Sequence, residues 1–518
     1  MIGISAVIFF ALSSLRHAMF HSGAFDLGIY DQVVYLISQG QPPISSFLGF
    51  HHLGNHAAWS VYPLGLLYKI YSDVHWLFAV QAVALALGAW PTWSLARLAG
   101  LSEAQALAMA AVYLLYPVVF NVNMFDFHPE VMALPVLLGT ILAARLNRVW
   151  WFTFAILFVV GCKEVLSLTI AAMGIWLFFF EKKRRCGAIA LFVGAAWFLI
   201  TSRVIIPTFS GAEPAAVYRY SYLGDSVPEI AKNLFLKPGL LLEGINIRDS
   251  LRYLFQVFLP VIWGLLPQHL APMVSALPAL VLNVLSVDPQ QRNLGVQYTL
   301  PVLPFLLLAV IPTLRAGQVW SRNSRLIILW SFLCFLALAN YKDYWTTYPT
   351  TLDTWQAKRE AIAQIQTKGG VLTTNRLAPH LTHRPLVKLV FSETPTADVV
   401  NASSVNLTQI DYVLLDAAHS GWLRTKEFTA NLVSQFKKNE SFQLRYQRDD
   451  IYLFVKKPKG SVGQLNSSRP LVNHVSEQGK HGSLSGGDKE NERPLGQILS
   501  DEDILNQGKH ATQEEHRC

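Results

Sequence analysis

The sequence predicts a mainly α-helical membrane protein: a polytopic bundle of transmembrane helices with a small α/β domain after it. Of the 518 residues, 52% are hydrophobic and only 15% are charged, whereas soluble domains contain about 25% charged residues. Apolar runs recur through residues 1–340. A membrane span needs about 20 such residues, or fewer where flanking polar side chains reach the interface. Beyond residue 340 the hydropathy falls, which separates the bundle from a second domain.

Each apolar run is predicted to be a spanning helix, which gives about eleven spans. The stretch from Leu254 to Leu285 is interrupted by prolines, and we interpret it as two short spans. The predicted spans are Ile2–Phe20, Trp76–Leu98, Glu103–Phe120, Val131–Leu146, Val149–Gly161, Val165–Phe180, Gly187–Ile206, Leu254–Leu266, Ala271–Leu285, Val296–Leu314 and Arg325–Asn340.

The basic residues predict the orientation of the bundle, because loops rich in lysine and arginine stay in the cytoplasm. With a cytoplasmic N-terminus, the turns after Phe120, Gly161 and Leu285 and the C-terminal domain are extracytoplasmic. Arg16 and the basic residues of the loop 207–252 depart from this pattern. The loops predicted to be cytoplasmic contain Arg97, Arg145, Arg148, Lys182, Lys183, Arg184, Arg185, Arg315, Arg322 and Arg325.

The net charge of +8 is therefore attributed to orientation in the plasma membrane, and nucleic-acid binding is not predicted. The lipid bilayer is the predicted partner of a multi-pass protein. The cysteines Cys162, Cys186, Cys334 and Cys518 are scattered without CxxC spacing. Neither a disulfide framework nor a structural zinc site is predicted from them.

Residues 341–457 predict a small extracytoplasmic α/β domain. Two amphipathic helices, Thr354–Thr367 and Thr425–Lys438, alternate with short apolar segments typical of strands. From 458 to 518 the composition turns polar, with almost no aromatic residues. Such a segment cannot bury enough apolar surface to fold, so a disordered tail is predicted there. The predicted strands are GVLTTN (370–375), LVKLVF (386–391), DYVLLD (411–416), FQLRYQ (442–447) and IYLFVKK (451–457).

Two carboxylates, Asp26 and Asp31, lie between the first two apolar runs. Ionisable groups set against a membrane bundle are costly unless they bind or transform something. On a helix, positions five apart lie about 140° apart around the axis. We therefore expect one aspartate to be a catalytic base or metal ligand and the other to support it. The alternative for Asp26 is an N-cap of a helix Leu27–Ser38.

Three histidines, His51, His52 and His56, follow in the same stretch. On a helix, His52 and His56 would lie one turn apart and could ligate a metal, although Gly54 disfavours a regular helix. Hydrogen bonding to a substrate and a merely polar turn are the alternatives.

The turn before the predicted span Val131–Leu146 carries Asp126, His128 and Glu130. Glu130 follows Pro129 at the start of the helix, where a carboxylate complements the helix dipole. This role does not explain Asp126 and His128, which add an acid and a titratable base at the same edge. All three are predicted to bind substrate.

Two further groups are predicted to lie at the same face. Lys163 and Glu164 occupy a tight turn between apolar helices, where they pair with each other or bind substrate. Arg292, Gln297 and Tyr298 lie in a later loop. The fork geometry of Arg292 suits a phosphate group, and the alternative is a solvated loop arginine.

With these residues in view, the segments FDLGIYDQ, HHLGNH, FDFHPE, QYTLPVLPF and DYVLLD and the turn Lys163–Glu164 resemble a prokaryotic family of integral-membrane proteins catalogued as domain of unknown function 2079. The resemblance covers Ser13 to Lys457. The sequence departs from the family pattern at Asn55 and Val165, where the family commonly has acidic residues.

That family is in turn similar to the GT-C glycosyltransferases, multi-span enzymes with an acidic residue in the first outer loop. The resemblance implies transfer of a sugar from a polyprenyl-phosphate donor to an envelope acceptor. It implies that Asp26 or Asp31 deprotonates the acceptor or coordinates Mg²⁺ or Mn²⁺, and that Arg292 with Lys163 holds the lipid phosphate. A transporter or lipid flippase, and a non-catalytic envelope-assembly protein, are the alternatives.

Overall fold

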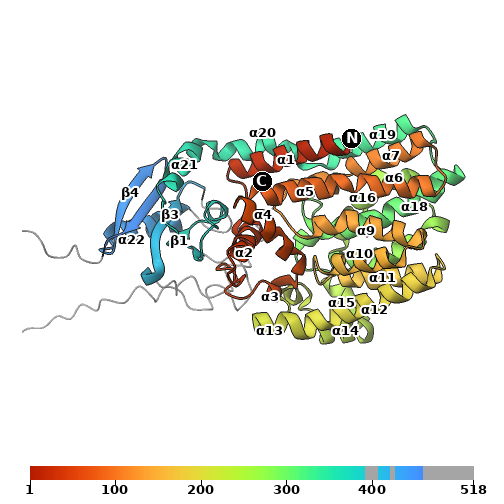
Figure 1. The fold of residues 1–518 in the computed structure, drawn as a ribbon, viewed down its shortest axis with the longest axis horizontal. Helices are drawn as coiled ribbons and strands as arrows, with labels where there is room; N and C mark the ends of the chain where they lie inside the picture. The colour runs from red at the N-terminus through yellow and green to blue at the C-terminus, as the bar shows by residue number, and fades with distance from the viewer. Residues whose placement is uncertain (391–406, 420–425, 459–518) are drawn as a thin grey trace, which may run out of the picture.

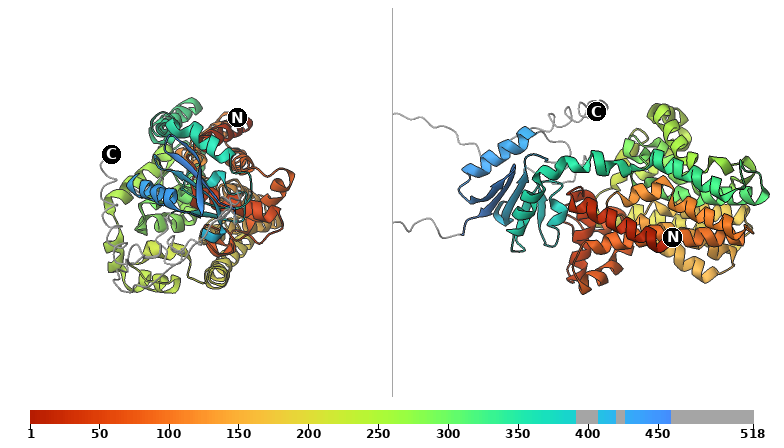
Figure 2. Two further views of the ribbon diagram at one scale, coloured as in Figure 1. Left: turned by 90° about the vertical axis from the view of Figure 1, so that its left-hand side faces the viewer. Right: turned by 90° about the horizontal axis from the view of Figure 1, so that it is seen from above.

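A computed structural model gives the fold of the chain and describes residues 1–390, 407–419 and 426–458. A helical bundle forms one end of an elongated molecule and a five-stranded sheet forms the other (Figures 1 and 2). The predicted fold class, many helices with a small mixed sheet near the C-terminus, is confirmed. The tail predicted for residues 458–518 lies, after Pro458, outside the described residues.

The helices of the bundle lie close to the predicted apolar runs. They are α1 (Ile2–Ala18), α5 (His75–Leu87), α6 (Ala89–Leu98), α7 (Glu103–Leu114), α8 (Pro117–Asn123), α9 (Glu130–Arg145), α10 (Val149–Val160), α11 (Leu166–Phe179), α12 (Arg184–Ile200), α16 (Ile247–Phe258), α17 (Leu277–Leu285), α18 (Leu303–Ala316) and α19 (Ser324–Leu338).

The predicted number of spans is not confirmed. Within the described ranges, 3 helices are long and apolar enough to cross a membrane, or up to 5 if each bent pair is one span. The long helices are His75–Leu98, Arg184–Ser210 and Gln297–Ala316. Proline explains part of the difference, because it removes a backbone donor and clashes with the preceding turn. The stretch 259–275, expected to contribute to two spans, forms short 3₁₀ turns that begin around Pro260, Pro267 and Pro272.

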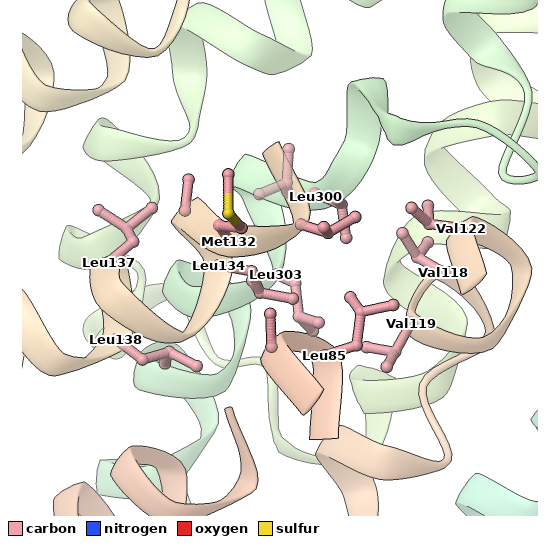
Figure 3. Close-up of a cluster of buried hydrophobic side chains, with 14 of the residues drawn as sticks. Leu85, Val118, Val119, Val122, Met132, Leu134, Leu137, Leu138, Leu300 and Leu303 are labelled. Carbon is pink, nitrogen blue, oxygen red and sulfur yellow. The ribbon is translucent and has the colours of Figure 1, made fainter. Parts of the chain in front are cut away.

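Packing inside the bundle depends on small and apolar side chains. A Cβ on Gly174 of α11 would lie 2.4 Å from the backbone nitrogen of Leu191 in α12, so glycine lets these two helices approach closely. Figure 3 shows aliphatic side chains of α5, α8, α9 and α18 packed in one core, among them Leu85, Val119 and Leu303.

The outer surface of the bundle is apolar. Trp150, Trp151, Phe154 and Phe192 are 64–78% exposed, an arrangement that favours lipid over water as the surrounding medium. Aromatic side chains next to a basic residue, here Arg148, are typical of a membrane interface.

The basic residues of the loops predicted to be cytoplasmic gather at the end of the bundle away from the sheet. There Arg145 pairs with Glu181 at 2.8 Å, and Lys183 Nζ donates to the carbonyl of Arg145. The ends of α6, α7 and α18 lie at this side, whereas the loops around α2 (Ile29–Ser38), α3 (Leu53–His56) and α4 (Gly65–Ile70) face the sheet (Figure 1).

The C-terminal sheet has the strand order β2-β1-β3-β5-β4. Strands β2 (Val387–Leu389), β1 (Gly370–Thr373) and β3 (Ile410–Asp416) run parallel. Strand β5 (Ile451–Lys456) pairs antiparallel with β3 on one side and with β4 (Phe442–Arg448) on the other. Alternate residues of a strand point to opposite faces. One face of the sheet packs against helix α21 (Trp355–Ala363), and the other face packs against helix α22 (Lys426–Lys438). Phe391 and Thr425, at the edges of predicted elements, lie outside the described residues.

The sheet and the bundle share a buried junction. Phe20, which follows α1, packs in the sheet core with Ala357 and Leu414. The ammonium of Lys358 lies 5.4 Å from the centre of the Phe20 ring and 2.9 Å from Asp416 Oδ2, and both charged side chains are fully buried. The N-terminal segment therefore completes the core on one face of the C-terminal sheet.

Replacing Lys358 with Ala is expected to destabilise the protein strongly, because it leaves the Asp416 carboxylate buried without its cation. Breaking a buried ion pair costs about 3–5 kcal/mol. Thermal unfolding of the detergent-purified protein measures the effect. The control is Arg448→Ala, which breaks the exposed pair with Glu360. Equal unfolding temperatures for Lys358→Ala and the unmodified protein would contradict the expectation.

Candidate active site

The loop after α1 holds Asp26 in a π-turn, η1 (Ala24–Gly28), which leads into α2. Asp26 lies inside this turn and makes no capping hydrogen bond, so the interpretation of Asp26 as an N-cap was wrong. The amide of Gly23 donates to Asp126 Oδ2 at 2.7 Å, and the amide of Ala24 donates to Asn375 Oδ1 at 2.8 Å. Single π-turns are frequent at functional sites.

The carboxylate of Asp26 faces His128. The two side chains approach to 3.3 Å between Oδ1 and Nε2, and the side chain of Asp26 is 35% exposed whereas that of His128 is buried. The other ring nitrogen, Nδ1, lies 3.0 Å from the carbonyl of Asp126. A proton on Nδ1 can therefore be donated to that carbonyl, while Nε2 points to Asp26.

Asp26 changes the proton affinity of His128. Burial lowers the pKa of His128, but the hydrogen bond and charge of Asp26, together with the charge of Glu130, raise it. The net pKa lies above the ordinary histidine value of about 6.5. The contact with Asp26 therefore favours the protonated form of His128.

Glu130 and Lys163 form a second, fully buried pair. Lys163 Nζ lies 2.7 Å from Glu130 Oε1. Glu130 Oε2 has no hydrogen-bond partner within the described part of the chain. The Lys163 ammonium also lies 5.5 Å from the centre of the Tyr298 ring. The two turns that the sequence singled out therefore meet in space.

Arg219 joins this group from η4 (Ala215–Tyr220). Its Nη2 donates to the hydroxyl of Tyr298 at 2.9 Å, and its Nε lies 3.4 Å from Asp288 Oδ2. The sequence indicated Arg219 only as one of several loop basic residues. The tyrosines on either side, Tyr218 and Tyr220, were the available signal for a partly buried arginine.

Tyr30 lies between the pairs and was also missed. Its ring packs against His128 and His52, with centroids 5.5 and 5.8 Å away. Burial and the charges of Glu130 and Asp26 raise the pKa of Tyr30 well above its ordinary value, so it stays a neutral donor.

Glu164 pairs with His56, whose Nδ1 lies 3.2 Å from Glu164 Oε2. His52 makes a different contact, with Nε2 3.3 Å from the carbonyl of Ala58. The ring of His51 stacks on Phe209, with centroids 4.5 Å apart. The three histidines thus have separate partners, and the helix that would place two of them on one metal is only Leu53–His56.

Asp31 and Arg292 make contacts outside this group, and Asp126 joins it through the amide of Gly23. Asp31 is buried and accepts hydrogen bonds from Tyr68 and Thr382. Asp126 forms a 2.5 Å ion pair with Arg16. Arg292 donates to carbonyls at the end of α17, among them that of Ser286 at 2.6 Å.

Gln297 lies buried at the start of η9 (Gln297–Val302) beside Tyr298, and within the described ranges its Oε1 has no partner. It remains a predicted substrate-binding residue.

The described residues do not fit a divalent cation at this site. Among them, no group of three or more His, Cys, Asp or Glu side chains could hold a metal ion. The carboxylates Asp26, Glu130 and Glu164 are each paired with a different basic side chain. What the site offers is acid–base and charge-pair chemistry by its own side chains.

The profile of the family described as "Predicted membrane protein (DUF2079)" matches residues 16–453. The chain belongs to this family. No curated protein matches the sequence significantly. The match to the DUF2079 family covers the bundle from Arg16 onward and most of the C-terminal sheet.

Among solved structures, the chain is similar to ArnT from Cupriavidus metallidurans bound to undecaprenyl phosphate. The TM-score is 0.50 at 11% identity, over 89% of this chain and 99% of that one. The apo state of ArnT from the same organism aligns with a TM-score of 0.47 at 11% identity, over 86% of this chain and 97% of that one. At this identity the likeness to the first structure shows that this DUF2079 protein shares the fold of ArnT.

Asp26→Asn is expected to lower the pKa of His128, because burial then acts without the opposing carboxylate charge. The shift is measured by NMR titration of histidine-labelled protein in detergent, with the His128 signal assigned by its loss in His128→Gln. Asp73→Asn is the matched control, since Asp73 pairs with the exposed His75. A His128 pKa that does not move in Asp26→Asn would contradict the described contact.

Proposed function

We propose that the protein is a GT-C-like glycosyltransferase of the plasma membrane. It transfers a sugar from a polyprenyl-phosphate donor to an envelope acceptor at the outer face. The first support is the fold, shared with a protein whose structure contains undecaprenyl phosphate. The second is the gathering of basic loops at the far end of the bundle, which favours a cytoplasmic position for that end. The site then lies at the extracytoplasmic end.

The observation that carries the proposal is the exposure of Asp26. The side chains of Asp31, Asp126, Glu130 and Glu164 are 1%, 2%, 4% and 9% exposed, whereas that of Asp26 is 35% exposed. Asp26 alone among these carboxylates combines access with a histidine partner. A general base must reach the proton that it removes, so we assign this role to Asp26 and a supporting role to Asp31.

In the proposed reaction, Asp26 and His128 act on the acceptor, and Lys163 and Arg219 act on the phosphate of the donor. The Asp26 carboxylate accepts the proton of the acceptor hydroxyl while the oxygen of that hydroxyl attacks the anomeric carbon of the donor sugar. The bond between that carbon and the phosphate oxygen breaks, and the polyprenyl phosphate leaves with the electron pair. The contact between His128 Nε2 and Asp26 Oδ1 holds Asp26 in position. Lys163 and Arg219, which meet at Tyr298, stabilise the negative charge of the leaving group.

Arg219 takes the role that the sequence analysis gave to Arg292, because Nη1 of Arg292 points at three carbonyls near the end of α17 and donates to them. Glu130, Glu164 and Gln297 supply buried acceptors for sugar hydroxyls. All these charges lie in turns at the end of the bundle. A transporter instead places ionisable groups near the middle of its spans, so the transferase is favoured.

Asp26→Asn is expected to reduce sugar transfer about 10²–10⁴-fold, the usual effect of removing a general base. The assay uses purified protein, a radiolabelled polyprenyl-phosphate sugar and membrane extract as the acceptor source. Asp31→Asn is expected to reduce transfer less, and Asp73→Asn to leave it unchanged. Full activity of Asp26→Asn would overturn the assignment of the base.

Arg219→Gln is expected to lower kcat/KM for the lipid donor about ten- to hundredfold, because a hydrogen bond to a charged group contributes about 1.5–3 kcal/mol. Arg292→Gln is the matched comparison from the neighbouring loop. A larger loss in Arg292→Gln than in Arg219→Gln would return the phosphate role to Arg292.

A further inference from the structure

The turn that follows β1 reaches out of the sheet and contacts the loop that carries Asp26. Asn375 lies in this turn, two residues after the end of β1, and its side-chain oxygen accepts the amide of Ala24 at 2.8 Å. A few residues later, Thr382 and His383 contact the carboxylate of Asp31, His383 at 3.2 Å. The segment thus contacts the first residue of the π-turn and, beyond the end of that turn, Asp31 in α2.

Asn375 and Asp126 hold the start of the π-turn together. Their oxygens accept consecutive amides, those of Ala24 and Gly23, one from the sheet and the other from the bundle. The three oxygens converge on Gly23: an ideal Cβ built there would lie 3.5 Å from Asp126 Oδ2, 3.7 Å from Asp26 Oδ2 and 3.9 Å from Asn375 Oδ1. The peptide between the two amides therefore has little freedom to rotate.

Further contacts of the same segment keep it in register with the loop. Gln32 Nε2 donates to the carbonyl of Arg384 at 3.1 Å. Ser46 Oγ donates to the carbonyl of Val387 at 2.8 Å, and the amide of Val387 donates back to Ser46 Oγ at 2.9 Å. These bonds fix β2 to the first loop, so Asn375 is held at a defined distance from Ala24.

We propose that Asn375 is a positioning residue of the active site, and that the C-terminal sheet is thereby a working part of the transferase. The inference rests on the proposed function. Asn375 fixes the π-turn so that the Asp26 carboxylate faces both His128 and the acceptor hydroxyl. A displacement of about 1 Å at a reacting group can cost about 10²-fold in rate. Asp126 still holds Gly23 when Asn375 is changed. The expected loss of activity therefore results from altered geometry at Asp26 and not from unfolding.

The test compares Asn375→Ala with Asn439→Ala. Asn439 is an asparagine of the same domain whose Oδ1 also accepts a backbone amide, that of Ser441 at 2.8 Å, in a turn away from the loop. Asn375→Ala is expected to lower kcat about ten- to hundredfold with KM within about twofold, and to leave the unfolding temperature nearly unchanged. Asn439→Ala is expected to leave kcat and KM unchanged.

Hydrogen exchange of the peptide covering residues 23–31 gives a readout that does not depend on activity. Asn375→Ala is expected to speed exchange of the Ala24 amide about tenfold or more, because the amide loses its acceptor. Asn375→Asp keeps an acceptor and is expected to restore slow exchange. Its added charge beside Asp26 is expected to move the acidic limb of the kcat–pH profile to higher pH.

Unchanged exchange in Asn375→Ala, or faster exchange with an unchanged kcat, overturns the positioning role. If the unmodified protein transfers no sugar, the proposed function fails instead. In that case the exchange of Ala24 still decides whether Asn375 holds the turn.

Discussion

The structure around the site depends on the buried carboxylate of Asp126. It pairs with the guanidinium of Arg16 at 2.5 Å and accepts the amide of Gly23 at 2.7 Å. It therefore ties the end of α1, the first loop and the turn before α9 to one point. Asp26 follows Gly23 by three residues and His128 follows Asp126 by two, so this carboxylate sets both partners of the 3.3 Å contact. Removing one member of such a pair leaves a buried charge, which is why the arrangement is hard to deform.

Hydropathy and alternation predicted most of the fold, because both are local properties of the sequence. The strand DYVLLD is β3 with one residue added at its start, Ile410. Because successive spans of a bundle alternate in direction, the order of the apolar runs also predicted that the turns carrying His128, Glu130 and Lys163 lie at the same end of the bundle. It did not predict the span count, because prolines such as Pro260 divide apolar runs into short turns.

The rest of the site depends on tertiary packing that no local pattern encodes. Asp26 and Asp31 were predicted to point in different directions, but only the position of the sheet decides that Asp31 is the one covered, by Thr382. Arg219 and Arg292 are both loop arginines. Arg292 donates to carbonyls at the end of α17, whereas Arg219 donates to the hydroxyl of Tyr298. Tyr298 lies far from Arg219 in the sequence, so no local pattern indicates which arginine contacts it.

The pairing of charges limits what the site can do with a phosphate. Lys163 is already close to Glu130, at 2.7 Å, whereas Arg219 approaches Asp288 only at 3.4 Å and through Nε. A guanidinium has five N–H donors and an ammonium three, and these described contacts use only some of them. The looser pair leaves Arg219 more of its charge and its planar fork for an incoming anion. Besides contributing positive charge to the leaving-group side, Lys163 keeps Glu130 ionised as an acceptor. The leaving-group side of the site therefore relies on Arg219 first, a loop residue whose position depends on Tyr298.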